Sequence, residues 1–480
     1  MKRKTLLTIL VFVAFVCALS ACSDNPAGSI VTSKNDGSFD ASILRPADSD
    51  NNTGEKSVVY CDSFSSLDGS VSFAFDVHSE IANGHLPVVE VAPHPLTVED
   101  AQRIAEVLFP EGVFYEDDPE RQLSSHEIQE NISYWSKYLD REMISDLYGS
   151  NSEEFIQSIQ EIVHRYLDYN LKLMESAPDN DNKLLCTWSF TPEKYAEKGT
   201  NTLSAIADTG IAEYKFIVSS RDEDDYKINN IFAYLNEDNS PNSMSAMVKR
   251  YELCKSAAPT DEEINNAVET VQRMLDNMGI GEWQVDEWGY SPLGRGTQEA
   301  YVIHVNAVPV FEGVQAIRQP QLDNLKSTEV YASNYYYTDA SFELSPGGVL
   351  LSCTISSPVD VIDVVNCQVQ TLSTENLLEK AKSHLSLFDY HNFSPELGEY
   401  TFLCKVTINE LDYGLTRVKV PNTDASYYYV PALTLRGRFQ SYEEQSGEIW
   451  IDSLEKDGSS QTLLVLNAVD GSIIYTTNGY

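Results

Sequence analysis

A capped amphipathic helix followed by strand-like runs occurs three times in the chain, and this recurrence most constrains the fold. The helices begin after Thr97, Thr260 and Ser373, and Asp100 and Glu263 complete capping boxes in the first two. Each helix carries a single apolar stripe, which a sheet must cover. The recurrence therefore predicts an α+β fold of repeated helix-plus-antiparallel-sheet units.

These units divide the chain into domains. We expect an N-terminal α+β domain over residues 57–255, a middle α+β unit over 256–371 and a C-terminal α+β unit over 372–480. The last unit should end in a three-stranded meander, because Asp457-Gly458 and Asp470-Gly471 separate alternating apolar runs. Leu466 lies in one of these runs and is expected to pack on the helix that follows Ser373.

A helical hairpin is expected as an insertion in the N-terminal domain. Ser124 and Glu127 form a capping box ahead of one long helix, and Gly149 separates it from a second. The apolar stripes of the two helices consist of Ile128, Ile132, Trp135, Leu139 and Met143 in the first, and Phe155, Ile159, Ile162, Tyr166 and Leu173 in the second.

Residues 1–22 have the pattern of an export signal. Three basic residues, Lys2 to Lys4, precede an apolar run over residues 6–16, and the segment ends in Leu19-Ser20-Ala21-Cys22. These last four residues resemble the lipobox of bacterial lipoproteins, which implies cleavage before Cys22 and lipidation of its thiol. The alternative is an ordinary secreted protein with a chance cysteine at the cleavage site.

The resemblance implies a protein anchored by lipid to the cell membrane on its extracytoplasmic side. Residues 23–56 are rich in Ser, Asn, Asp and Gly and have no hydrophobic period, so a flexible tether is expected there. After the signal, no apolar run approaches the roughly 20 residues that a membrane helix needs. The membrane is therefore an expected partner through Cys22 alone.

The charge balance argues against nucleic acid as a partner. The chain has 33 basic and 73 acidic residues, a net charge of -40, and no basic cluster. A polyanion would be repelled by such a surface. Solubility of an exported protein explains this acidity, and binding of divalent cations or cationic partners is the alternative.

Six cysteines remain outside the signal and the lipidation position. They are Cys61, Cys186, Cys254, Cys353, Cys367 and Cys404. Several lie in apolar runs, where a free cysteine behaves as a small buried hydrophobe. A disulfide between Cys353 and Cys367, which lie in adjacent strand-like runs, is the alternative.

The motifs of common enzymes are absent or incomplete. The run His126 to Glu130 lacks the second histidine of a zinc protease motif, and Ser453 to Lys456 lacks the companion motifs of penicillin-binding proteins. Ser291 follows Gly289-Tyr290, but Leu293 replaces the second glycine of a nucleophile elbow, and Pro292 cannot donate an N–H. We therefore predict no catalytic residue and no cofactor.

No metal site is predicted either. The acidic run Asp222 to Asp225 is interpreted as a solvated turn, and Asp179 to Asn182 begins like a calcium loop without completing one. His78, His85 and His94 are close in sequence but lack a supporting pattern of cysteines or carboxylates.

Two tyrosine runs, residues 335–337 and 427–429, have two interpretations. They can pack within strands, or they can offer aromatic platforms for sugars or peptides, since consecutive strand residues face opposite sides.

The run from Leu464 to Ile474 resembles the terminal hairpin of PepSY-like domains. Together with the lipobox and the repeated helix-plus-strands order, the chain resembles uncharacterised surface lipoproteins of Firmicutes that carry such units. The resemblance implies no activity.

Three functions are compared on this basis. The leading hypothesis is a non-enzymatic protein-binding or regulatory lipoprotein, the alternative is a glycan- or peptide-binding surface lipoprotein, and the third is a hydrolase with a site built from scattered residues. Hydrogen-bonded titratable groups in a pocket favour an enzyme, exposed tyrosines in a groove favour a ligand binder, and a large uncharged patch favours a partner protein.

Overall fold

The computed structural model describes most of the chain after residue 54. The described residues are 44, 55–82, 86–118, 121–148, 150, 152–180, 182–192, 200–223, 226–236, 244–293, 300–317, 338–387, 402–420, 426–443, 446–447, 449–452 and 461–474. Strands hold 45% of them and helices 28%, in two large, mostly antiparallel sheets with seven helices. The predicted α+β fold of repeated helix-plus-sheet units is therefore wrong, because the molecule is mostly β and its sheets are not repeats.

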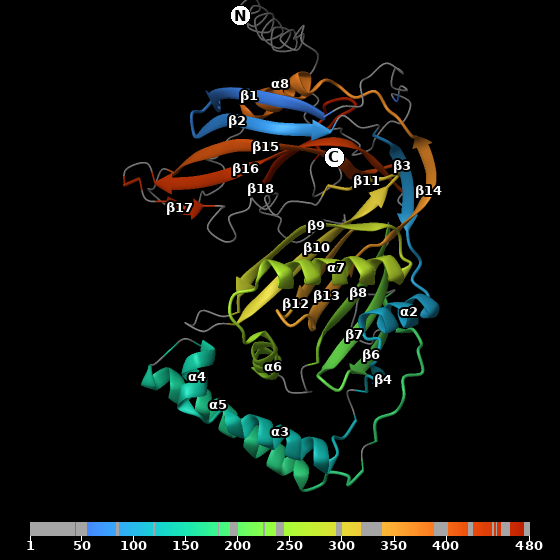
Figure 1. Cartoon of the computed structure of the whole chain (residues 1–480), viewed down its shortest axis with the longest axis vertical. Coiled ribbons are helices and arrows are strands. Elements are labelled where there is room, and N and C mark those ends of the chain that lie inside the picture. Colours follow the sequence, from blue (N-terminus) through green and yellow to red (C-terminus); the bar gives the residue numbers. More distant parts are fainter. Residues whose placement is uncertain are drawn as a thin grey trace, which may run out of the picture.

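One sheet has eight strands. Its central order is β1-β2-β15-β16-β3-β14, and β17 and β18 also pair with β16. The strands are β1 (Glu55–Ser65), β2 (Val71–Ala82), β3 (Val88–Pro93), β14 (Val359–Asn366), β15 (Phe402–Lys419), β16 (Tyr427–Glu443), β17 (Ile449–Asp452) and β18 (Gln461–Asn467). Helix α8 (Thr374–Leu385) covers one face of this sheet (Figure 1).

The other sheet has ten strands. Its order is β11-β10-β12-β13-β8-β7-β6-β4, with β9 paired to β10 and β5 to β6. The strands are β4 (Val113–Glu116), β5 (Thr191–Pro192), β6 (Thr200–Asp208), β7 (Glu213–Glu223), β8 (Tyr226–Leu235), β9 (Trp283–Pro292), β10 (Tyr301–Phe311), β11 (Val314–Gln315), β12 (Asp339–Leu344) and β13 (Leu350–Ser356).

Helices cover one face of this second sheet. Helix α7 (Asp261–Met278) and helix α2 (Val98–Leu108) bury their apolar stripes in the same core as the strands, and α7 crosses the sheet in Figure 1. The predicted caps are confirmed: Thr97 and Thr260 form capping boxes, and Ser373 caps α8. Local capping chemistry thus sets where these helices begin.

The repeats fail because strands far apart in the sequence share a sheet. Strand β2 pairs in parallel with β15, and Phe75 lies opposite Ile408 in that pairing. Strand β3 pairs with both β14 and β16, and β8 pairs with β13. Hydrophobic alternation identifies a strand and its buried face but contains no information on its partner. The division of the chain at residues 255 and 371 stays a prediction.

The predicted hairpin contains three helices instead of two. They are α3 (Ser125–Lys137), α4 (Arg141–Tyr148) and α5 (Glu153–Met174), at the far end of the molecule in Figure 1. The first predicted helix breaks at Asp140, whose carboxylate accepts from the backbone N–H of Glu142 at 2.7 Å. Trp135 of α3 stacks on Tyr166 of α5 with ring centroids 4.7 Å apart, so the two helices form the expected antiparallel pair.

The predicted three-stranded meander at the C-terminus is also wrong. Both β17 and β18 pair with β16, β18 along its middle and β17 near its C-terminal end, and not with each other. The turn at Asp470-Gly471 does return the chain, since Leu466 and Ile473 form an antiparallel bridge. Leu466 is fully buried in one cluster with Leu377 and Leu378 of α8, which confirms the expected packing.

The two sheets meet through a shared apolar cluster. It includes Phe311 of β10 and Tyr429 of β16, whose ring centroids are 4.3 Å apart. Tyr427 and Tyr429 are both buried, so this tyrosine run packs within the protein, whereas residues 335–337 lie outside the described residues. Tyr428 faces the other side of β16 and is half-buried, so at most one of the three rings in the run at 427–429 is accessible.

The six cysteines are free. Cys254, Cys353 and Cys404 are buried, as expected of small hydrophobes, and burial raises the pKa of Cys254 to about 12. The alternative disulfide is wrong, because Cys353 is buried in β13 while Cys367 is exposed beyond β14 in the other sheet. Among the described residues, no helix has the length and apolar character needed to cross a membrane.

Candidate functional site

One face of the ten-stranded sheet carries a row of side chains that are polar with one exception, Ile206. Residues paired across neighbouring strands share a face. The pairing runs through seven strands in the order His304, Glu343, Ser352, Tyr234, Lys215, Ile206 and Tyr115. We call these residues the polar row.

The next row along the strands is entirely buried. It consists of Val305, Phe342, Cys353, Ala233, Phe216 and Ala205, each at most 1% exposed. All of these residues except Ala205 belong to the core that α2 and α7 cover. Alternation with a period of two therefore places the polar row on the opposite, open face.

Helix α6 (Met244–Cys254) lies over part of this open face. Arg250 of α6 donates from Nη2 to Glu343 Oε2 at 2.7 Å. Beyond α6, residues from the N-terminal part of α3 line the same hollow as the strands at the other end of the row. A cleft is left between these helices and the sheet.

The cleft has a volume of about 930 Å³. Its lining includes the polar-row residues Tyr115, Ile206, Lys215 and Tyr234, together with residues of α3 and the β6–β7 turn. Ligand pockets in proteins measure about 300 to 1,000 Å³, so the cleft has room for a drug-sized or peptide-sized ligand.

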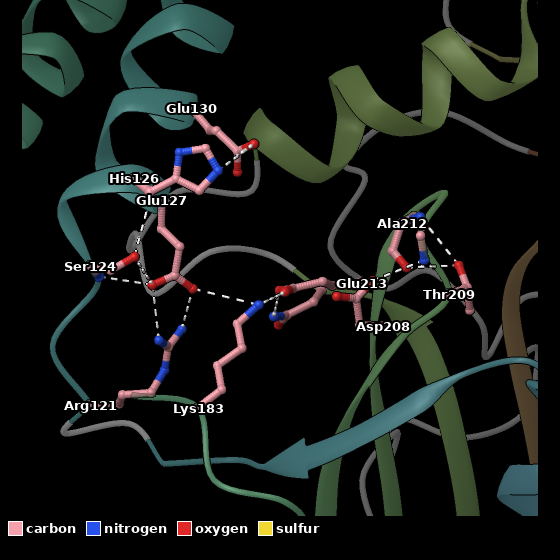
Figure 2. Close-up of polar contacts among 12 residues, drawn as sticks. Arg121, Ser124, His126, Glu127, Glu130, Lys183, Asp208, Thr209, Ala212 and Glu213 are labelled. Carbon is pink, nitrogen blue, oxygen red and sulfur yellow. Dashed lines mark hydrogen bonds and ion pairs between the residues drawn. The ribbon is translucent and has the colours of Figure 1, made fainter. Parts of the chain in front are cut away.

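Glu127 is the centre of the charge network in this cleft (Figure 2). It accepts a two-pronged contact from the Arg121 guanidinium, with distances of 3.0 and 2.9 Å, and it caps α3 through Ser124. Lys183 joins it to Glu213, with Nζ 2.6 Å from Glu213 Oε1 and 3.5 Å from Glu127 Oε1. The network connects three parts of the fold: α3, the segment that precedes β5, and strand β7.

The pKa of Glu127 follows from these contacts. Burial alone would raise it, but the hydrogen bonds from Arg121 and Ser124 outweigh burial and lower the pKa of Glu127 to about 2. The carboxylate is therefore charged throughout the physiological range, and both cations face a permanent anion.

Both signs of charge line the cleft. Seven acidic residues and five basic residues contribute to it, although acidic residues outnumber basic ones by 73 to 33 in the chain. The basic residues are Arg121, Lys137, Lys183, Lys215 and Lys249. The balance of charges in the cleft is thus less acidic than in the chain as a whole, and the cleft suits a ligand that carries charges of both signs.

The other end of the polar row brings a serine and a histidine together. Ser291 of β9 lies with Oγ 2.7 Å from His304 Nε2, and His304 Nδ1 lies 3.6 Å from Glu343 Oε1. Glu343 in turn accepts from Ser352 Oγ at 2.5 Å. Burial lowers the pKa of His304, so its ring is neutral at pH 7 and can accept a proton.

Glu343 is charged in this arrangement. Burial acts to raise its pKa, but Ser352 and Arg250 together lower the pKa of Glu343. The order serine, histidine and carboxylate is that of a catalytic triad, with a long final contact.

The structure places the sequence candidates as follows. Glu127 is a capping residue of α3, as predicted, and His126 is exposed. Asp222 and Glu223 belong to β7, and residues 224–225 lie outside the described residues. Residues 1–22, with the predicted lipidation site Cys22, also lie outside the described part of the chain.

No protein-family model matches the chain, and no curated protein matches it. The chain is similar in structure to an uncharacterized protein from Eubacterium rectale ATCC 33656, with a TM-score of 0.37 and 10% sequence identity. The match covers 85% of this chain and 91% of that one. The resemblance to PepSY-like domains stays a prediction.

Sequence reasoning missed both the cleft and the contact between Ser291 and His304. Alternation did contain part of the signal: Lys215 stands between the buried Tyr214 and Phe216, and Glu343 stands between Phe342 and Leu344. Such residues must face away from the core. Their assembly into one row depends on strand order, which the sequence pattern does not contain.

Proposed function

We propose that this chain is a lipid-anchored, extracytoplasmic binding protein without catalytic activity, and that its cleft holds an extended segment of a protein partner. The cleft itself is the observation that carries this proposal. It combines a volume of about 930 Å³, side chains of both charges and three tyrosines, Tyr115, Tyr134 and Tyr234.

A polypeptide segment matches this lining better than a glycan does. Peptides carry amino, guanidinium and carboxylate groups, which the acidic and basic side chains of the cleft can pair with. Tyrosine offers apolar area and a hydroxyl at a low entropic cost, so it suits the contact with a peptide backbone. The five basic side chains that line the cleft also argue against a purely cationic partner, which they would repel.

Equilibrium binding of a peptide library to the mature, lipidated protein tests this proposal. Tyr234→Ala and Lys249→Ala should each weaken the tightest peptides by about tenfold, which corresponds to about 1.4 kcal/mol. Tyr290→Ala is the matched control, because Tyr290 is an exposed tyrosine of β9 that does not line the cleft. Peptides that bind all three variants as tightly as the wild type would overturn the proposal.

The contact between Ser291 and His304 favours a second candidate function, a serine hydrolase. Ser291 Oγ would attack an ester carbonyl carbon while its proton moves to His304 Nε2. The bond to the leaving alkoxide then breaks as His304 gives that proton to the alkoxide, which leaves as an alcohol. Water next attacks the acyl group on Ser291 while its proton moves to His304, and the acid leaves as His304 returns the proton to the serine oxygen. Glu343 would hold the ring of His304.

Binding remains the first candidate because of Pro292. The residue after a nucleophilic serine often donates its N–H to the oxyanion, and proline has none. A fluorophosphonate probe separates the two functions. A hydrolase requires labelling of Ser291 that is lost in His304→Gln and on unfolding, whereas a native wild-type protein that stays unlabelled excludes this candidate.

A further inference from the structure

Three potential metal ligands meet on the exposed face of the β1–β2 ribbon. They are Cys61 of β1 and Asp76 and His78 of β2, and their ligand atoms all lie within 4.8 Å of one another. Asp76 Oδ1 lies 3.8 Å from Cys61 Sγ and 3.3 Å from His78 Nε2. None of the three belongs to the cleft or the polar row.

These distances match the edges of a tetrahedral zinc site. Bond lengths of about 2.3 Å to sulfur and about 2.0 Å to nitrogen and oxygen, at the tetrahedral angle, place sulfur about 3.5 Å and nitrogen about 3.3 Å from the carboxylate oxygen. The two distances to the carboxylate oxygen of Asp76 are therefore within a few tenths of an ångström of these edges, and the sulfur of Cys61 and the imidazole nitrogen of His78 lie within 4.8 Å of each other. A thiolate, an imidazole and a carboxylate form a set that Zn²⁺ prefers over Mg²⁺ or Ca²⁺.

The backbone fixes this arrangement. Cys61 lies directly opposite Asp76 in the antiparallel register, and His78 lies opposite Val59, so the three side chains share one face. On the other face, Asp62 pairs with Lys382 of α8 at 2.5 Å, and Tyr60 donates to Glu379 of the same helix at 3.2 Å. Helix α8 therefore holds the ribbon from the opposite face, while the three ligands face solvent.

We propose that Cys61, Asp76 and His78 form a zinc site with three protein ligands and one position open to water. Three protein ligands with a free fourth position leave the ion able to take a further ligand. The site is independent of the proposed function, because it lies in the other sheet.

Titration of the mature, lipidated protein with Co²⁺ alone tests the site, in a thiol-free reducing buffer that keeps Cys61 reduced. We expect one equivalent of Co²⁺ to produce a sulfur-to-cobalt charge-transfer band in the near ultraviolet, which Zn²⁺ then removes. Cys61→Ser should abolish the band. Asp76→Asn and His78→Gln should each weaken the affinity for Zn²⁺ by more than about tenfold, the loss that even an outer-shell partner can cause.

Two matched variants serve as controls. Cys367→Ser removes another exposed cysteine, and His126→Gln removes another exposed histidine beside a carboxylate. Both should bind Co²⁺ as the wild type does, and all variants should melt at the wild-type temperature in the absence of metal. A band that is missing in the wild type, or that survives in Cys61→Ser and vanishes in Cys367→Ser, would overturn the proposal.

Discussion

At the scale of single residues, Glu127 links the start of a helix to the charge network of the cleft. Its carboxylate accepts hydrogen bonds from the backbone N–H of Ser124 and from Arg121, and it forms an ion pair with Lys183. Glu127→Gln would leave two cations facing a neutral amide, so we expect a loss of about 1 to 3 kcal/mol in unfolding free energy at pH 7. Urea unfolding measures this loss, and Glu130→Gln on the exposed side of α3 should change stability by less than about 0.5 kcal/mol.

The same carboxylate predicts a dependence on pH. The pKa of Glu127 falls from 4.5 to about 2 on folding, so the stability that it contributes is complete above pH 4.5 and is lost as the pH falls toward 2. The difference between wild type and Glu127→Gln should therefore shrink over this window. A difference that stays constant from pH 7 to pH 2.5 would contradict the assigned pKa.

At the scale of elements, β18 has a structural role through Leu466. This side chain is fully buried between the sheet and α8, so Leu466→Ala should destabilise the protein by about 2 to 5 kcal/mol. Asp470→Ala should cost less, because Asp470 organises a turn by accepting from the backbone N–H and the hydroxyl of Ser472. Thermal melts compare the two, and a neutral Leu466→Ala with a damaging Asp470→Ala would reverse this assignment.

The pairing of β15 with β16 depends on a glycine. A Cβ added to Gly437 would lie 1.9 Å from the carbonyl oxygen of Thr407, which is backbone of the neighbouring strand and cannot yield. Gly437→Ala should therefore destabilise the protein by about 1 to 3 kcal/mol or more, as overpacking does. Gly289→Ala is the control in β9, where an added Cβ meets nothing within 4 Å. Equal melting temperatures of the two variants would contradict the close approach.

Local signals predicted the elements better than their assembly. The caps at Thr97, Thr260 and Ser373 were predictable because each depends on a side chain and a backbone N–H a few residues apart. The pairing of β2 with β15 was not, because it joins residues more than 300 positions apart and no turn connects them. Asp140 ended a helix that periodicity alone would continue.

At the scale of the whole molecule, the candidate site arises from strand order. Tyr115, Lys215 and Glu343 lie on strands β4, β7 and β12, and they face one side of the sheet because β6, β8 and β13 pair in register between these strands. The sequence pattern predicts that each residue faces away from the core, but it does not predict that the residues lie in one row. The proximity of Cys61 to His78 could not be predicted either, because it depends on the register of β1 against β2.

Attachment to the membrane is a prediction for the whole chain. Cys22 is the expected lipidation site, and two acyl chains hold a soluble domain at a bilayer far more firmly than one does. Cys22→Ala should therefore release the protein from membranes or block its maturation. Fractionation of cells tests this, and a variant that remains with the membrane as the wild type does would contradict the lipoprotein assignment.

The most direct test of the central claim is photo-crosslinking in native membranes. A photoreactive phenylalanine analogue replaces Tyr234 inside the cleft or, as the control, the similarly exposed Tyr290 outside it, with exposed fractions of 38% and 47% in the wild type. A partner bound in the cleft predicts a discrete crosslinked protein at position 234 that is absent at position 290. A partner captured equally at both positions, or at position 290 alone, would contradict the cleft as the binding site.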